Sequence, residues 1–343
     1  MRRSANRWRP RAGALLGVAA LLLATFVAVP AAASERGADR SWASASTTSG
    51  TPQPTAQMRG ADPLGGSCFG APTTLSIWAH YDDDLLFAGS RLDDAIHAGN
   101  CIRTVFLTGG DAGKGPGYAA GREQGIMRAY NVMRGEKSEW TSTDVTLDSG
   151  AKVVAWRPTD DDRVTLVFFR LPDGNLQGQG FPTTGDVSLL KLANGVIPSL
   201  RSLSGSYSLT WQQIVDSLDA LIHRFTPATI LTSVPGDSRK WSAGDHADHQ
   251  MVGNATREAW ENAGYPVDLV SYAIGYQSEN FAPNIEGDAL VRKIDAFSAY
   301  AHGDTVVDKC VNYKSCLAVP RFGAWLQRQY ARTDAGLFTD DGP

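Results

Sequence analysis

The chain has 343 residues, with 32 Lys+Arg against 36 Asp+Glu, which gives a formal net charge of −4. Because 43% of the residues are hydrophobic, the chain can bury a sizeable core, and wholesale disorder is excluded. The first 33 residues hold five arginines and no acid, so the remainder carries 27 basic against 36 acidic residues, a net charge of −9. That surplus of acid argues against general nucleic-acid binding, which needs basic side chains to neutralise phosphates.

Residues 1–33 have the three parts of an export signal. An arginine-rich start is followed by the uncharged run 12–29 and by three alanines before Ser34. We therefore expect a signal peptide and a secreted, extracellular protein with no stable membrane span once the signal is removed. Since the run of 18 residues also comes near the lower limit for a membrane helix, an uncleaved anchor is the alternative.

Residues 34–66 are rich in Ser, Thr, Ala, Gly and Pro and lack apolar periodicity, as in a flexible linker. Beyond them strand and helix signals alternate, which predicts βαβ units and a parallel sheet. The expected strands are 74–79, 102–107, 228–233 and 268–274, and the expected helices are 85–97, 119–133, 211–225, 249–263 and 288–301.

Residues 138–210 interrupt this alternation. Two further strands, 152–156 and 164–170, precede the strong turn signal Pro172-Asp173-Gly174-Asn175. We expect an antiparallel insertion and a long functional loop over 172–206. The chain as a whole predicts one α/β domain over 67–335, with a Rossmann-like, doubly wound, mostly parallel sheet, followed by a C-terminal tail over 336–343.

Four cysteines, Cys68, Cys101, Cys310 and Cys316, predict two disulfides in an exported chain, and three pairings are possible. We favour Cys68–Cys101, since these residues lie at the heads of two expected neighbouring strands. The second pair, Cys310–Cys316, would then enclose only five residues. A zinc site built from the cysteines is disfavoured because the sequence contains no C-x-x-C pair.

Two motifs rich in histidine and aspartate each follow an expected strand. Ala79-His80-Tyr81-Asp82-Asp83-Asp84 lies at the carboxyl end of the first strand, where open α/β sheets bind their ligands. Three adjacent carboxylates repel one another unless a cation neutralises them. Asp245-His246-Ala247-Asp248-His249 precedes a helix, and its two histidines share one side of a first helical turn.

Either motif alone has an ordinary structural explanation as a solvated turn or a helix cap. Because both follow strands of one expected sheet, the pair predicts a metal centre. Two histidines and one carboxylate with an open position form a hydrolytic zinc set.

His80-Tyr81-Asp82-Asp83-Asp84 resembles the His-Pro-Asp-Asp-Glu signature of the PIG-L/LmbE-like family of zinc-dependent de-N-acetylases. His246-Ala247-Asp248-His249 is similar to that family's His-Pro-Asp-His, and the resemblance spans roughly residues 72–305. Tyr81 stands where the family has proline, and Asp84 stands where it has glutamate. Neither position is an expected metal ligand.

The resemblance implies that His80, Asp83 and His249 bind Zn²⁺, another divalent metal being the alternative. Asp82 would then be the general base that deprotonates a metal-bound water. His246 would stabilise the oxyanion or protonate the leaving amine. Side chains of adjacent residues in a turn point in different directions, so Asp83 can bind the metal while Asp82 acts on its bound water.

Further residues are expected around this centre. Asp248 would accept a hydrogen bond from a histidine ring and so orient it. Asp84 would do the same or cap a helix. Expected substrate contacts are Asp111, Arg122, Tyr118 and Trp241. A surface salt bridge is the alternative for Arg122, while Tyr118 and Trp241 could support the face of a pyranose ring.

We therefore expect a secreted zinc hydrolase, an N-acetylglucosaminyl deacetylase-like enzyme that acts on an N-acetylated amino sugar or GlcNAc-containing glycoconjugate. One alternative is a zinc amidase or esterase that acts on a thiol conjugate or natural product. Another is a secreted carbohydrate-binding protein with weakened catalysis. Asp82 beside Asp83 argues against binding alone, because binding needs no base next to a metal ligand.

Overall fold

The computed structural model describes residues 62–66, 68, 70–339 and 342. The predicted signal peptide and most of the predicted linker, residues 1–61, lie outside the described residues. Within the described ranges no helix is both long and apolar enough to cross a membrane.

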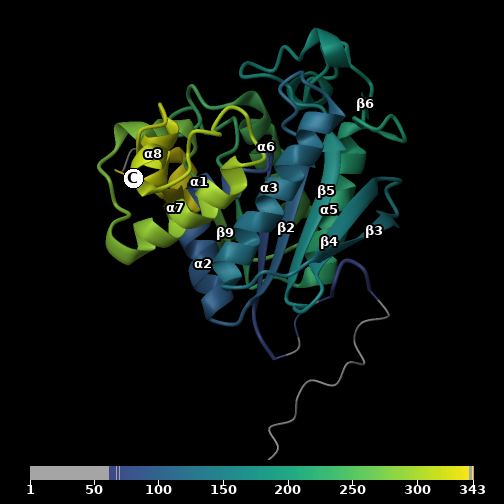
Figure 1. Cartoon of the computed structure of the whole chain (residues 1–343). Helices are drawn as coiled ribbons and strands as arrows, with labels where there is room; N and C mark the ends of the chain where they lie inside the picture. Colours follow the sequence, from purple (N-terminus) through teal and green to yellow (C-terminus); the bar gives the residue numbers. More distant parts are fainter. Residues whose placement is uncertain (1–61, 67, 69, 340–341, 343) are drawn as a thin grey trace, which may run out of the picture. The chain divides into compact units, whose positions relative to one another are not determined.

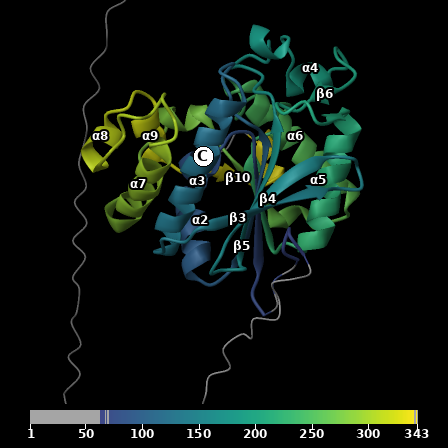
Figure 2. The same cartoon turned by 45° about the vertical axis from the view of Figure 1, so that its right-hand side comes forward.

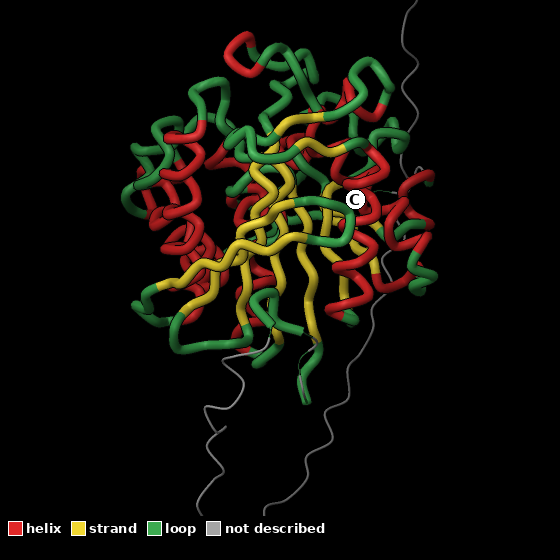
Figure 3. The backbone as a smooth tube through the Cα atoms, turned by 90° about the vertical axis from the view of Figure 1, so that its right-hand side faces the viewer, coloured by secondary structure: helices red, strands yellow, loops and turns green. Residues whose placement is uncertain are grey.

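Eight strands of the described chain form one sheet, in the order β10-β9-β8-β1-β2-β5-β4-β3. Figure 3 shows the strands in yellow and the helices in red. The five strands from β9 to β5 in this order are parallel, while β10 at one edge and β4 and β3 at the other are antiparallel. This is the expected doubly wound, mostly parallel α/β sheet. The strands are β1 (Thr73–Trp78), β2 (Cys101–Thr108), β3 (Trp140–Thr146), β4 (Lys152–Pro158), β5 (Val164–Leu171), β8 (Thr229–Ser233), β9 (Val270–Ala273) and β10 (Ala331–Arg332).

Helices cover both faces of this sheet, as Figures 1 and 2 show. One hydrophobic core lies between the sheet and helices α5 and α6, and a second lies between the sheet and helices α1, α2, α3 and α7. The helices are α1 (Asp83–Phe87), α2 (Gly89–His97), α3 (Pro116–Arg134), α4 (Leu189–Ala193), α5 (Trp211–Phe225), α6 (Ala247–Asn262), α7 (Gly287–Ala301), α8 (Tyr313–Leu317) and α9 (Phe322–Leu326).

Local sequence explains where the long helices begin and end. Thr210 and Gln213 form a reciprocal capping box at the start of α5. Pro116 occupies the first turn of α3, where its missing N–H is not needed, and Gly135 ends the helix in the left-handed conformation. All six residues of β1 are buried, as expected for a central strand with helices on both faces.

The region 138–210 differs in detail from its predicted form. β4 pairs antiparallel with β5, as expected, and also with β3, while the other edge of β5 pairs in parallel with β2. β3 was not predicted because most of its side chains are exposed and give no apolar alternation. The long loop after β5 carries α4 and a two-stranded ribbon, β6 (Leu200–Arg201) and β7 (Ser208–Leu209).

Two predicted boundaries need correction. Leu64, assigned to the linker, is buried in the core beside α5 and α6, and Asp62 pairs with Arg224. Leu337, assigned to the tail, is buried within a short 3-10 helix, η5 (Ala335–Phe338). A single apolar residue in a polar segment leaves no periodic signal, yet it is buried wherever the fold offers an apolar surface.

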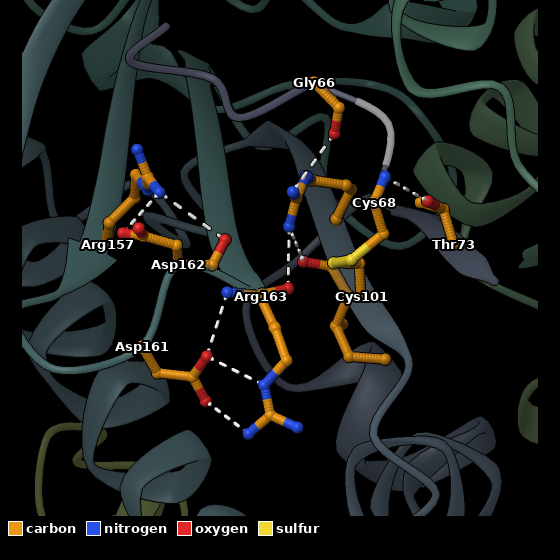
Figure 4. Close-up of a disulfide and its surroundings, with 10 residues drawn as sticks. Gly66, Cys68, Thr73, Cys101, Arg157, Asp161, Asp162 and Arg163 are labelled. Atoms are coloured by element: carbon orange, nitrogen blue, oxygen red, sulfur yellow. Dashed lines mark hydrogen bonds and ion pairs between the residues drawn. A yellow bond between two sulfur atoms is a disulfide. The ribbon is translucent and has the colours of Figure 1, made fainter. Parts of the chain in front are cut away.

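The described cysteines form the two favoured disulfides, Cys68–Cys101 and Cys310–Cys316. Figure 4 shows the first, which ties the segment before β1 to the first residue of β2. The backbone N–H of Cys68 also donates to the Thr73 hydroxyl, at 3.4 Å. The second disulfide joins the segment after α7 to α8.

Candidate metal centre

Both motifs lie at the carboxyl end of adjacent parallel strands. β1 leads through His80 and Asp82 into α1, which begins at Asp83. β8 pairs in parallel with β1, and the segment after β8 leads to His246, the N-cap of α6. Because the ends of parallel neighbours meet at one edge of a sheet, the two motifs converge.

Three of their side chains surround one point. His80 Nδ1 lies 3.2 Å from His249 Nε2, and these nitrogens lie 3.5 and 3.0 Å from the two oxygens of Asp83. Ligand atoms of a tetrahedral zinc ion are about 3.3 Å apart. The three side chains are buried, and the backbone N–H of His80 donates to the Asp83 carboxylate at 2.7 Å. This donor set fits zinc.

The other ring nitrogen of His80 faces a second group of potential ligands. His80 Nε2 lies 3.4 Å from Asp248 and 3.8 Å from Asp173, and His246 completes this group. A histidine that binds a metal through one nitrogen commonly donates its other N–H to a carboxylate. The position of Asp248 therefore agrees with metal binding through His80 Nδ1.

Asp82 sits beside this centre without joining it. Arg122 donates to Asp82 Oδ1, which leaves Oδ2 to accept a proton. Burial raises the pKa of Asp82 to about 6; Arg122 opposes this rise and the negative charge of Asp83 adds to it.

His246 has a fixed tautomer. The backbone N–H of Asp248 donates to His246 Nδ1 at 3.1 Å, so Nδ1 carries the lone pair and Nε2 carries the proton. Burial lowers the pKa of His246 to about 4, which keeps the ring neutral. It is thus the Asp248 backbone, and not its carboxylate, that orients this histidine.

A cavity of roughly 140 Å³ opens beside these groups. Its lining combines polar side chains with apolar and aromatic ones. Its polar lining residues are His80, Asp82, Asp83, Tyr118, Arg122, Asp173, His246 and Asp304, and its apolar ones are Leu86, Ala112, Tyr276, Val306, Phe322 and Trp325.

Arg122 and Tyr118 line this cavity, but both already have protein partners. The Arg122 guanidinium donates to Asp82, to the Gly110 carbonyl and to the Tyr300 hydroxyl, and its Nε lies 3.1 Å from Asp304. The Tyr118 hydroxyl donates to Asp304. Arg122 is therefore a buried link between Asp82 and Asp304, and not the surface salt bridge considered above.

Three predicted residues lie away from the cavity lining. Trp241 is 2% exposed, with the Arg332 guanidinium 4.5 Å from its ring centroid, so no sugar can rest on it. Asp111 accepts the backbone N–H groups of Asp173 and Gly115 and shapes their loops. Asp84 accepts the Tyr130 hydroxyl and the Leu85 backbone N–H, both at 2.8 Å.

Four further residues lie at the site without a role predicted from the sequence: Asp173, Asp245, Asp304 and Tyr276. Asp173 follows β5 at the same sheet edge. Its place directly after an expected strand is the feature of the sequence that could have identified it as a site residue. Asp245 is the first residue of the second motif, and its carboxylate accepts the His249 Nδ1–H at 2.9 Å. Asp304 and Tyr276 lie in segments without a motif.

The family model described as "PIG-L: GlcNAc-PI de-N-acetylase" matches residues 75–260, a span that contains both motifs. The chain belongs to the PIG-L family. No curated protein matches this PIG-L chain.

Several solved structures resemble this PIG-L protein. A conserved protein from Thermus thermophilus is 18% identical, with a TM-score of 0.40, over 76% of this chain and 93% of that one. N,N'-diacetylchitobiose deacetylase from Pyrococcus horikoshii is 11% identical, with a TM-score of 0.41, over 77% and 83%. A deacetylase of the teicoplanin biosynthesis pathway is 14% identical, with a TM-score of 0.44, over 76% and 95%. Likenesses this distant do not identify a substrate for the present chain.

Proposed function

We propose that this PIG-L protein is an exported zinc-dependent hydrolase that removes the N-acetyl group from an amino sugar or GlcNAc-containing glycoconjugate. The observation that carries the proposal is the convergence of His80, Asp83 and His249 within 3.5 Å of one another, beside a cavity lined by Asp82 and His246. Membership of a de-N-acetylase family supports the reaction class.

Zinc is the proposed metal because two imidazoles and one carboxylate are its usual hydrolytic ligands. When bound, zinc polarises an amide carbonyl and makes water a stronger nucleophile at neutral pH. Export is supported by the N-terminal pattern of residues 1–33 and agrees with the two disulfides.

In the proposed reaction Asp82 Oδ2 accepts a proton from the attacking water while Arg122 holds Oδ1. A C–O bond to the acetyl carbon forms and the C–N bond to the sugar breaks. The neutral His246 ring donates its Nε2–H as a hydrogen bond to the developing carbonyl oxygen, and the proton taken up by Asp82 passes to the leaving nitrogen. The products are acetate and the free amine.

The test measures amine release from a panel of N-acetylated sugars, with added zinc and with a chelator. We expect hydrolysis that is lost on chelation and restored by zinc. Asp82→Asn should retain one zinc per chain and lose roughly 10²–10⁴-fold in turnover, because only the general base is removed.

Asp94→Asn is the matched control, since the Asp94 side chain is 73% exposed and does not line the cavity. It should behave like the wild type. Undiminished turnover in Asp82→Asn would contradict the mechanism. Hydrolysis of acetyl esters without any sugar amide would instead favour the esterase alternative.

A further inference from the structure

We propose that Asp245 is a positioning residue that fixes the metal-binding nitrogen of His249. This inference rests on the proposed role of His249 as a metal ligand. It assigns a function to the first residue of the second motif, whose carboxylate does not line the cavity.

The contact between His249 and Asp245 is short and shielded from solvent. His249 Nδ1 lies 2.9 Å from Asp245 Oδ1, and the two residues are 1% and 5% exposed. A neutral imidazole carries one N–H and one lone pair. With its hydrogen on Nδ1 toward Asp245, His249 presents the lone pair of Nε2, which is the nitrogen 3.0 Å from Asp83 and 3.2 Å from His80.

The Asp245 carboxylate is itself held in place. Its Oδ1 accepts the backbone N–H of His246 at 2.9 Å and that of Tyr276 at 3.2 Å. Its Oδ2 packs against Gly275, where any β-carbon would collide with it. The backbone of two neighbouring segments therefore fixes the carboxylate, and the carboxylate fixes the ring of His249.

Asp248 does not duplicate this role for His249. Its Oδ2 accepts the Gly174 N–H at 2.7 Å and lies 3.4 Å from His80 Nε2. Each proposed histidine ligand therefore has its own carboxylate next to its second ring nitrogen, Asp248 for His80 and Asp245 for His249. The contact of Asp245 is the shorter one. Carboxylates in this position orient the ring and increase its basicity, and their loss commonly weakens metal binding roughly 10–100-fold.

The experiment measures the zinc dissociation constant by chelator competition, without substrate. Asp245→Asn keeps the shape and one acceptor oxygen but removes the charge, and Asp245→Ala removes both. We expect roughly 10–100-fold weaker zinc binding in Asp245→Asn and a larger loss in Asp245→Ala. The control is Asp237→Asn, an exposed carboxylate in the same segment between β8 and α6, which should bind zinc like the wild type.

Two further measurements separate positioning from a general structural effect. Urea unfolding of the chelated proteins should show that Asp245→Asn remains folded. The visible absorption of bound Co²⁺ should change in the Asp245 variants and not in Asp237→Asn, because the ligand geometry changes.

Wild-type zinc affinity in Asp245→Asn and Asp245→Ala would overturn the proposal, and so would equal weakening in Asp237→Asn. The outcome is independent of the proposed substrate. A wild-type protein that binds zinc but hydrolyses no sugar amide would refute the proposed reaction and leave the test of Asp245 intact.

Discussion

At the scale of single residues, the site depends on side chains that divide closely related tasks. Asp82 and Asp83 are adjacent, yet Asp82 bonds to Arg122 while Asp83 faces two histidines. The difference arises because α1 begins at Asp83, so that the two carboxylates leave the chain in different directions. Arg122 is buried and bonded to Asp82 and Asp304, which suits it to orienting Asp82.

We predict that Arg122→Lys lowers kcat by roughly 10²-fold with little change in KM. Lysine keeps the charge but cannot bond to Asp82, Asp304 and the Gly110 carbonyl together, so Asp82 is misplaced. Steady-state kinetics on the best substrate of the panel measures the effect. A large rise in KM at unchanged kcat would instead return Arg122 to the substrate-binding role expected from the sequence.

At the scale of elements, one buried lysine connects three helical segments near the site. Lys293 of α7 is 3% exposed, and its Nζ donates to the carbonyl oxygens of Leu86, Trp325 and Arg328. These acceptors lie at or just after the C-terminal ends of α1 and α9, where carbonyls lack helical partners. α1 contributes Asp83 and α9 contributes Trp325 to the cavity lining, so Lys293 helps to hold two of the helices that line the cavity.

We predict that Lys293 makes stability depend on pH. Burial lowers the pKa of Lys293 from 10.5 to about 7, so between these values the unfolded chain binds more protons than the folded one. Its contribution to the free energy of unfolding should therefore rise with pH across that window, by roughly 1 kcal/mol per unit. Below about pH 7 both states are protonated and the contribution should level off.

Urea unfolding of the metal-free protein at several pH values between about 7 and 10 measures this dependence. The comparison is with Lys293→Met, which retains the length of the side chain but has no amine. The difference in unfolding free energy between wild type and variant should move in favour of the wild type as the pH rises. A difference that stays constant across this range would contradict the lowered pKa.

At the scale of the whole described chain, the two disulfides lie in different functional settings. Cys68–Cys101 anchors the segment before β1 at the start of β2, where the strands begin. Cys310–Cys316 lies between Asp304 and Phe322, two residues that line the cavity. Cys68–Cys101 therefore stabilises the fold, whereas Cys310–Cys316 also holds a segment that lines the cavity.

We predict that Cys68→Ser/Cys101→Ser lowers the free energy of unfolding by about 3–4 kcal/mol, because this disulfide closes the longer loop. Cys310→Ser/Cys316→Ser, which opens a loop with a sequence separation of 6, should cost about 2 kcal/mol. Kinetics on the folded variants should show a raised KM only for the second pair. The reverse order of effects on KM would contradict the assignment of that segment to the cavity.

The sequence by itself determined the α/β fold, both motifs and the favoured cysteine pairs. Periodicity reports burial along one element, and the two motifs are recognisable because histidines and aspartates are concentrated in a few residues. The same local reasoning located α5 (Trp211–Phe225), whose amphipathic pattern begins directly after its N-cap, Thr210.

Tertiary structure alone decided which side chains meet. Trp241 and Asp111 were expected at the substrate and are buried outside the cavity lining, while Asp173, Asp245 and Asp304 come from separate segments to contact His80, His249 and Arg122. Such contacts depend on how strands and helices pack. The sequence around a single aspartate in a loop does not indicate which side chain it will contact. Site residues that are concentrated in one motif can be recognised in the sequence. Residues that contact the site from separate segments can be identified only in the tertiary structure.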